Sequence, residues 1–152
     1  PLLHLHWVGA SGWALPPCSI AVVEDVWREV EMHDVGALVD RRLTRVVAET
    51  PLHPEVLRLG MDPGETAALS YALAPQRRAE ALLLCDEASA RRACAALSLP
   101  VVGSIGLILE AFRAGRASRD LAAAALLDLP HKGRLHVRAE LLQRALDGLA
   151  IS

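Results

Sequence analysis

The sequence predicts an α/β fold, a three-layer α/β/α sandwich with a mostly parallel sheet. Short apolar runs alternate with segments of helical periodicity, which is the pattern of parallel strands joined by helical crossovers. Aromatic residues make up only 3% of the chain, so a core of Ala, Leu and Val would let helices approach a sheet closely. With 152 residues, 53% of them apolar, we expect a single domain over residues 1–152.

Four segments have the composition of strands, and the helices lie between and after them. The expected strands cover residues 20–23, 45–47, 81–85 and 101–102. The expected helices cover residues 64–74, 87–97 and 105–114, with more helix after Ala117 and a break around residues 130–133. A further helix contains Trp27, while His4 and His6 share a strand-like alternation.

Charge, cysteine content and hydropathy exclude several classes of protein. A net charge of −2 argues against nucleic-acid binding by general electrostatic attraction, so any such contact would be local. The cysteines Cys18, Cys85 and Cys94 are odd in number and lack metal-type spacing, which favours a reducing compartment. The apolar runs are far shorter than the ~20 residues of a membrane span, and no signal peptide is visible. We therefore expect a cytoplasmic protein without membrane association.

Asp86 is the first candidate functional residue, because it directly follows an apolar strand segment. In open parallel sheets, ligands bind beyond the carboxyl ends of the strands. The alternative is that Asp86 only caps the following helix, in which Glu87 would pair with Arg91. Position alone favours the cap.

Glu65 is the second candidate, in the first turn of a predicted helix, where the helix dipole favours an acid whatever its function. The small residues that follow would let this helix pack tightly against the sheet and hold Glu65 near Asp86. Two converging carboxylates repel each other unless a cation lies between them, and oxygen ligands of this kind select Mg²⁺ or Mn²⁺. The pair therefore predicts a metal site.

Ser104 is a third candidate, at the end of the next strand. Its hydroxyl could orient a metal-bound water, although capping of the next helix is the commoner use of such a serine. The spacing of Gly103 and Gly106 does not form a nucleophile elbow, so we do not expect Ser104 to be a nucleophile. The histidines form no zinc motif, and the glycines form no phosphate loop.

The remaining charged residues are explained by solvation of the surface. This applies to the acids Glu24, Asp25 and Glu29 after the first predicted strand. Small basic clusters at residues 91–92 and 132–138 are also most simply solvated faces. If one of them contacts a phosphate backbone, its contribution would appear as salt-dependent binding.

Three blocks of the sequence follow one another in a fixed order: GETAALSYA from residue 64, LLLCDE from residue 82 and LPVVGSIG from residue 99. In this order they resemble the PIN-domain superfamily, and within it a prokaryotic branch related to VapC-type toxins. Residues 20–30 resemble that branch's second strand and the helix after it, with Val23 where a proline often stands. The motifs are short, and their order carries the resemblance over nearly the whole chain.

The resemblance implies a ribonuclease in which three or four acids bind one or two Mg²⁺ or Mn²⁺ ions. Glu65 matches the acid at the helix start, Asp86 matches the acid after the central strand, and Ser104 falls where many members have Asp, Asn or Thr. The implied mechanism is metal activation of water for in-line attack on the phosphorus of RNA. The implied partners are an RNA substrate and a small antitoxin protein.

The family's first acid lies on a strand that would precede the segment beginning at Pro1. Because that strand would be central in the sheet, we expect it to lie upstream of this sequence. Two functions stay open: a metal-dependent ribonuclease, such as the toxin of a toxin–antitoxin pair, or a degenerate PIN-like module for binding or homodimerisation. In the second, Glu65 and Asp86 are only helix caps.

Overall fold

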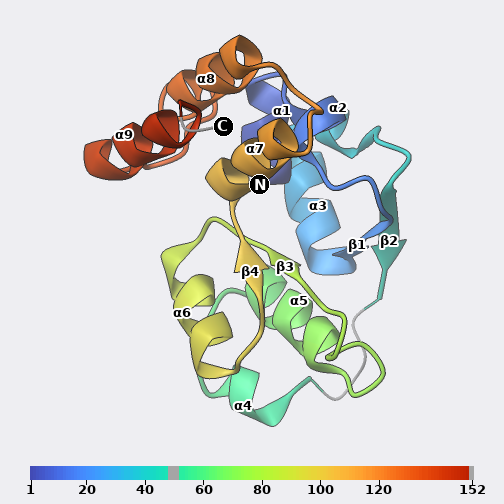
Figure 1. Ribbon diagram of the computed structural model, residues 1–152. Helices are drawn as coiled ribbons and strands as arrows, with labels where there is room; N and C mark the ends of the chain where they lie inside the picture. Colours follow the sequence, from blue (N-terminus) through green and yellow to red (C-terminus); the bar gives the residue numbers. More distant parts are fainter. Residues whose placement is uncertain (48–51, 151–152) are drawn as a thin grey trace. The chain divides into compact units, whose positions relative to one another are not determined.

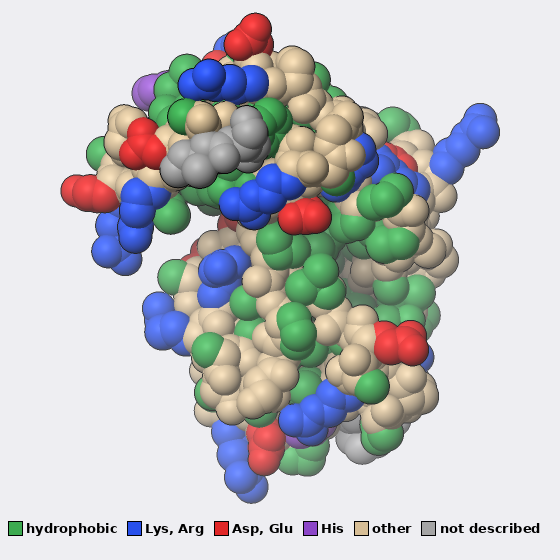
Figure 2. All heavy atoms as spheres, in the orientation of Figure 1, with side chains coloured by type: hydrophobic (Ala, Val, Ile, Leu, Met, Phe, Trp, Pro, Cys, Tyr) green, Lys and Arg blue, Asp and Glu red, His purple; other side chains and the backbone are tan. Residues whose placement is uncertain are grey.

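The computed structural model describes residues 1–47 and 52–150, and its fold is mixed α/β with parallel strands (Figure 1). The chain forms two compact units. The sheet unit is the continuous stretch Ser19–Val102, and the helical unit combines Pro1–Cys18 with Gly103–Ser152. On the face shown in Figure 2, acidic and basic side chains are interspersed over both units. No helix among the described residues is long and apolar enough to cross a membrane.

The sheet unit contains two pairs of parallel strands with helices packed against them. Its elements are β1 (Ile20–Val23), α3 (Glu24–His33), the 3-10 helix η1 (Val35–Leu38), β2 (Leu43–Val46), α4 (Pro54–Leu57), α5 (Pro63–Leu73), β3 (Leu83–Leu84), α6 (Ala88–Ala96) and β4 (Val101–Val102). β1 pairs with β2, and β3 pairs with β4. The expected parallel strands are present, but in the described residues they form two two-stranded sheets and not one larger sheet.

Helix α5 is the central element of the sheet unit, because it contacts α3, α4, β1 and β3. Pro63 begins this helix, at a position whose N–H would have no partner within the helix. Small residues let the neighbouring elements approach closely, and most of the helix is buried. The buried residues are Gly64, Thr66, Ala67, Leu69, Ser70, Ala72 and Leu73. A helix with most of its surface buried is typical of a core position, and only Glu65, Ala68 and Tyr71 form a half-buried stripe along it.

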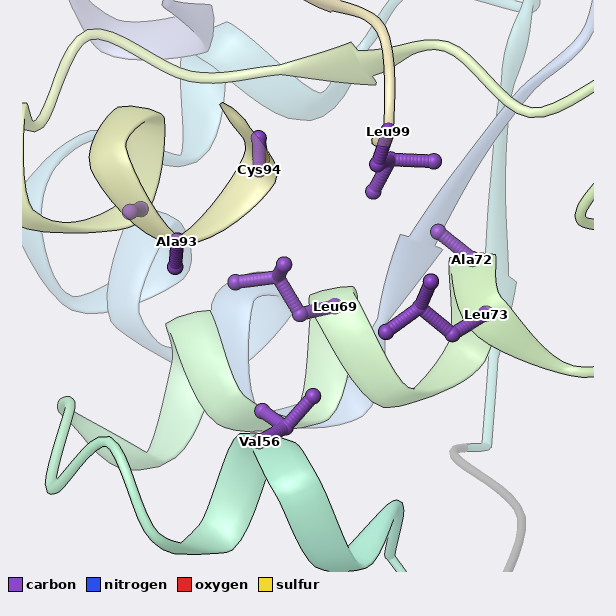
Figure 3. Close-up of a cluster of buried hydrophobic side chains, with 8 residues drawn as sticks. Val56, Leu69, Ala72, Leu73, Ala93, Cys94 and Leu99 are labelled. Carbon is purple, nitrogen blue, oxygen red and sulfur yellow. The ribbon is translucent and has the colours of Figure 1, made fainter. Parts of the chain in front are cut away.

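The core of the sheet unit is built from side chains of α4, α5 and α6 and the segment before β4 (Figure 3). It consists of Val56, Leu69, Ala72, Leu73, Ala90, Ala93, Cys94 and Leu99. Leu69 is 0% exposed, and burial of a side chain of this size is worth about 1.5–3 kcal/mol. Ala90, Ala93 and Cys94 form the buried face of α6, as its helical periodicity predicts.

The helical unit packs helices from two separate stretches of chain. The described ones are α1 (Leu2–Trp7), α2 (Ser11–Ala14), α7 (Ser104–Arg113), α8 (Arg119–Asp128) and α9 (Ala139–Gly148). Helix α7 contacts α2, α8 and α9. After α7, the Nη1 atom of Arg116 donates to the carbonyl oxygens of Trp13, at 2.6 Å, and Leu15, at 2.9 Å. These charge-assisted hydrogen bonds fasten the first stretch to the second.

The helices predicted at residues 64–74, 87–97 and 105–114 correspond to α5, α6 and α7, each within one residue at either end. The strand-like alternation at His4 and His6 is not a strand. Both residues lie in α1, because Leu2 and Leu5, three residues apart, are the side chains that this segment buries. The break predicted around residues 130–133 separates α8 from α9.

Candidate active site

Glu65 lies in the first turn of α5, where two polar groups hold its carboxylate. The carboxylate accepts hydrogen bonds from the backbone N–H of Asp62 and from the hydroxyl of Ser89. Burial raises the pKa of Glu65, and the negative charges of Glu87 and Asp62 raise it further. Carboxylates therefore converge at the start of α5, from the turn before this helix and from the loop after β3.

Asp86 lies half-buried in the loop between β3 and α6. Helix α6 begins at Ala88, and its N-cap residue is Glu87. Asp86 therefore lies one residue before the capping position that the alternative assigned to it. Arg91, which we expected to pair with Glu87, donates from Nη1 to the carbonyl oxygen of Cys85 at 3.1 Å. This hydrogen bond fixes the backbone immediately before Asp86.

Cys85 shows that Glu65 and Asp86 lie in one neighbourhood of the sheet unit. Burial is the main reason that the pKa of the Cys85 thiol is raised, and the charges of both Glu65 and Asp86 raise it further. The two acids are thus close enough to act on the same thiol, one from the start of α5 and one from the end of β3.

Ser104 belongs to the helical unit, where it is the first residue of α7. The N-cap residue of this helix is Gly103. Ser104 therefore does not occupy the capping position, which was the commoner use expected for it. The side chain is 0% exposed. A role of Ser104 at the acidic site stays a prediction.

Glu29 is an acid near this site that the sequence reasoning assigned to the surface. Its Oε2 atom lies 3.5 Å from the position that a Cβ atom on Gly64 would occupy. The same position is 3.1 Å from the Cγ2 atom of Val26, so the absence of a side chain at Gly64 lets α3 lie close to the start of α5. Glu29 itself is exposed, so its assignment to the surface is confirmed, and what the sequence did not predict is its closeness to Gly64.

Glu24, by contrast, has the role of a structural ion pair. It pairs with Arg28 at 2.8 Å and also with Arg45 on β2. The hydrogen bond from Arg45 is the main reason that the pKa of Glu24 is lowered, whereas that of Glu65 is raised. The two carboxylates therefore differ in kind: Glu24 is neutralised by arginines, and Glu65 faces other acids.

The donor chemistry at Glu65 fits a divalent cation. Carboxylate oxygens are the ligands that Mg²⁺ and Mn²⁺ prefer. Burial is the main reason that the pKa of Glu65 is raised, and a cation would offset the repulsion from Glu87 and Asp62 that raises it further. Among the described residues, no group of three or more His, Cys, Asp or Glu side chains is arranged to hold a metal ion. Glu65 and Asp86 are the residues that would hold one, with Glu29, Asp62 and Glu87 as further carboxylates nearby.

Fold and site together define an α/β protein with converging carboxylates beside the end of a parallel strand. A family model described as a PIN domain matches residues 1–150. The chain therefore belongs to the PIN-domain family, whose members are typically nucleases and usually use divalent metals. Comparison with curated proteins gave no match, and neither did comparison with solved structures.

Proposed function

We propose that the protein is a metal-dependent ribonuclease of PIN type that hydrolyses RNA phosphodiester bonds, as the toxin of a toxin–antitoxin pair with a small antitoxin partner. The observation that carries the proposal is that Glu87 acts on the carboxylate of Glu65, and that Glu65 and Asp86 both act on the Cys85 thiol. Membership of the PIN-domain family supports the same function.

In this proposal Glu65 and Asp86 bind one Mg²⁺ or Mn²⁺ ion. A bound divalent cation supplies activation of water and stabilises negative charge on the phosphate oxygens. The N–H of Asp62 and the hydroxyl of Ser89 orient the carboxylate of Glu65. Arg91 positions Asp86 by holding the carbonyl of Cys85, while Glu29 adds negative charge.

The same proposal includes a single domain with one three-layer α/β/α sheet that contains both strand pairs. Two facts support this architecture: β1 and β3 each have one strand neighbour in the described residues, and α5 contacts both of them. A two-stranded sheet alone is marginally stable. Hydrogen exchange provides the test. Backbone amides of β1 and β3 should be protected to a similar degree, because the strands of one sheet open together. Protection confined to one of the two strand pairs would contradict the proposed sheet.

A second candidate function is a non-catalytic PIN-like module that binds a partner or forms a homodimer. The hydrogen bond from the Asp62 N–H to Glu65 favours it, because an acid at the third helical position commonly satisfies this N–H for structural reasons alone. Mixed with Mn²⁺, such a module would bind no ion at Glu65 and cleave no RNA.

The test compares RNA cleavage by the wild type, Glu65→Gln and Asp86→Asn in Mg²⁺ and in Mn²⁺. Both variants keep the side-chain shape and remove the charge, and we expect each to lower the cleavage rate at least about 100-fold. Glu80→Gln is the matched control, because Glu80 is an exposed acid in the same unit. Cleavage by Glu65→Gln or Asp86→Asn at the wild-type rate would overturn the site. No cleavage by any form in either metal would favour the binding module.

Binding of Mn²⁺ gives a second measurement that does not depend on catalysis. Electron paramagnetic resonance of free Mn²⁺ should show an ion taken up by the wild type and by Glu80→Gln, and much weaker uptake by Glu65→Gln and Asp86→Asn. Equal uptake by all four proteins would place the ion elsewhere.

A further inference from the structure

The connection between α8 and α9 is a basic surface loop. Residues 129–138 contain no acid, and their exposed polar side chains are His131, Lys132, Arg134, His136 and Arg138. The helical unit as a whole has seven Lys and Arg against five Asp and Glu, whereas the sheet unit has nine against thirteen. The helical unit thus has a net charge of +2, whereas the sheet unit, which contains Glu65 and Asp86, has a net charge of −4.

The backbone of this loop has a fixed conformation. Gly133 donates to the carbonyl of Asp128, and Leu135 donates to the carbonyl of Leu129, both at 3.0 Å. A Cβ atom on Gly133 would lie 2.7 Å from the Leu129 carbonyl oxygen, so only glycine fits there. Arg134 follows with a φ of 53°, in the left-handed region that few residues other than glycine adopt. Backbone strain of this kind recurs at functional sites.

Arg134 is held over an aromatic ring while its polar atoms stay available. Its guanidinium carbon lies 5.0 Å from the centroid of the Trp7 ring, and the His4 ring lies 6.5 Å from that ring. The guanidinium groups of Arg134 and Arg138 have no hydrogen-bond acceptor among the described residues. Lys132 differs, because it pairs with Asp128 at 2.8 Å. Two arginines are therefore ready to donate to an external anion.

We infer that the loop of residues 131–138 and the Trp7 ring bind the phosphate backbone of single-stranded RNA. This inference rests on the proposed function, which supplies RNA as the substrate. Arginine suits phosphate because its planar fork donates two hydrogen bonds at once. The adjacent Trp7 and His4 rings give an unpaired base a surface on which to stack.

The test measures binding of a fluorescein-labelled single-stranded oligouridylate of about 12 nucleotides, a length typical of such sites. Fluorescence anisotropy is recorded in EDTA, so that no cleavage occurs, over a series of salt concentrations. Arg134→Asn removes the charge with a residue that tolerates the left-handed backbone, and Arg138→Gln removes the second charge. Arg119→Gln is the matched control, an exposed arginine at the opposite end of α8.

We expect each loop variant to raise the Kd about 3- to 10-fold at low salt, and the control to leave it unchanged. The double variant should reduce the slope of log Kd against log salt by about 1.4, since each lost phosphate contact removes about 0.7. Trp7→Leu should also weaken binding although it removes no charge, while Trp7→Phe should largely restore it.

Cleavage assays of the same variants in Mn²⁺ separate this inference from the proposed function. If the wild type binds and cleaves RNA but the double variant binds equally well, the loop inference is overturned and the nuclease stands. If the loop variants lose binding while no form cleaves RNA, the loop inference is supported and the nuclease fails. Absence of RNA binding by the wild type overturns the inference.

Discussion

The sheet unit and the helical unit place their functional candidates at different distances from their cores. In the sheet unit, α5 carries both the fully buried Leu69 and, one turn earlier, Glu65, so site and core share one helix. In the helical unit, the basic loop connects α8 and α9, and its charged side chains are exposed. The acidic site should therefore be sensitive to core packing, whereas the basic loop should tolerate changes in the core.

The largest effect expected from this comparison is that of a cavity in either core. Leu69→Ala and Leu126→Ala truncate fully buried leucines of the sheet unit and the helical unit. Each should lower the free energy of unfolding by about 2–5 kcal/mol, measured by urea denaturation. Leu69→Ala should also weaken Mn²⁺ binding, because it loosens the helix that carries Glu65, while Leu126→Ala should not.

The same pair tests whether the chain behaves as the single domain that we expect. In that case both variants shift one cooperative transition, seen alike by tryptophan fluorescence and by circular dichroism. Two separate transitions, each moved by only one variant, would contradict the single domain and strengthen the division into two units.

The next effect concerns the arginine that joins the two stretches of the helical unit. Arg116→Gln removes the charged donor to the carbonyls of Trp13 and Leu15. We expect the free energy of unfolding to fall by about 2 kcal/mol, the range for hydrogen bonds to charged groups. Arg119→Gln, an exposed arginine on the adjacent helix, should change stability by less than about 0.5 kcal/mol. Equal effects of the two substitutions would show that the two stretches are held by packing alone.

A smaller effect should come from the glycine that shapes the basic loop. A methyl group at Gly133 would meet backbone atoms of Leu129 and the Val8 side chain. Gly133→Ala should therefore lower the free energy of unfolding, measured by thermal denaturation, by about 1–3 kcal/mol. At Gly12 an added Cβ would have no atom within 4 Å, so Gly12→Ala should be neutral or slightly stabilising. If Gly133→Ala is as stable as the wild type, the loop is less rigid than its geometry implies.

The smallest effect is electrostatic, and it belongs to the sheet unit. The pKa of Glu65 is raised in the folded protein, so folding favours the protonated carboxyl group. This contribution to stability is fully present below the pKa of Glu65 in the unfolded chain, and it is lost as the pH rises through the pKa of Glu65 in the folded protein. Glu65→Gln should remove this dependence. At pH 7 the variant should be more stable than the wild type by about 0.5 kcal/mol, with a smaller difference at pH 4.

Urea denaturation at several pH values measures this difference. Glu80→Gln should follow the wild-type pH profile. Mn²⁺ should remove the advantage of Glu65→Gln, because a bound cation offsets the repulsion among the carboxylates. If the wild type is more stable than Glu65→Gln at neutral pH, then Glu65 is not repelled by its neighbours.

Local sequence patterns predicted much of the secondary structure. The strands at Ile20–Val23 and Val101–Val102 match the predicted ranges, and α5, α6 and α7 match within one residue. These elements are set by periodicity and by breakers such as Pro63, which act over a few residues. In residues 2–7 the pattern is ambiguous, since the leucines fit both a strand alternation and a helix that buries Leu2 and Leu5.

Features that depend on distant residues were not predictable in the same way. The proximity of Glu29 to the start of α5 depends on Gly64, which lies 35 positions later in the sequence. The choice of Asp86 and Glu65 as site residues stays a prediction, although the charges of both act on the Cys85 thiol. The N-cap of α6 is Glu87, one residue after the expected Asp86. The division into two units has no local signal, since it results from packing between the first 18 residues and the stretch after Val102.

This discontinuous packing has a consequence for synthesis of the chain on the ribosome. Translation adds roughly 5–20 residues per second, so about 5–20 s separate Trp13 and Leu15 from their hydrogen-bond donor, Arg116. The whole sheet unit emerges during that interval and can begin to fold. Leu5, Ala14 and Leu15, which are buried in the finished protein, stay exposed until α7 follows. We therefore expect these early residues to be the part of the nascent chain that depends most on chaperones.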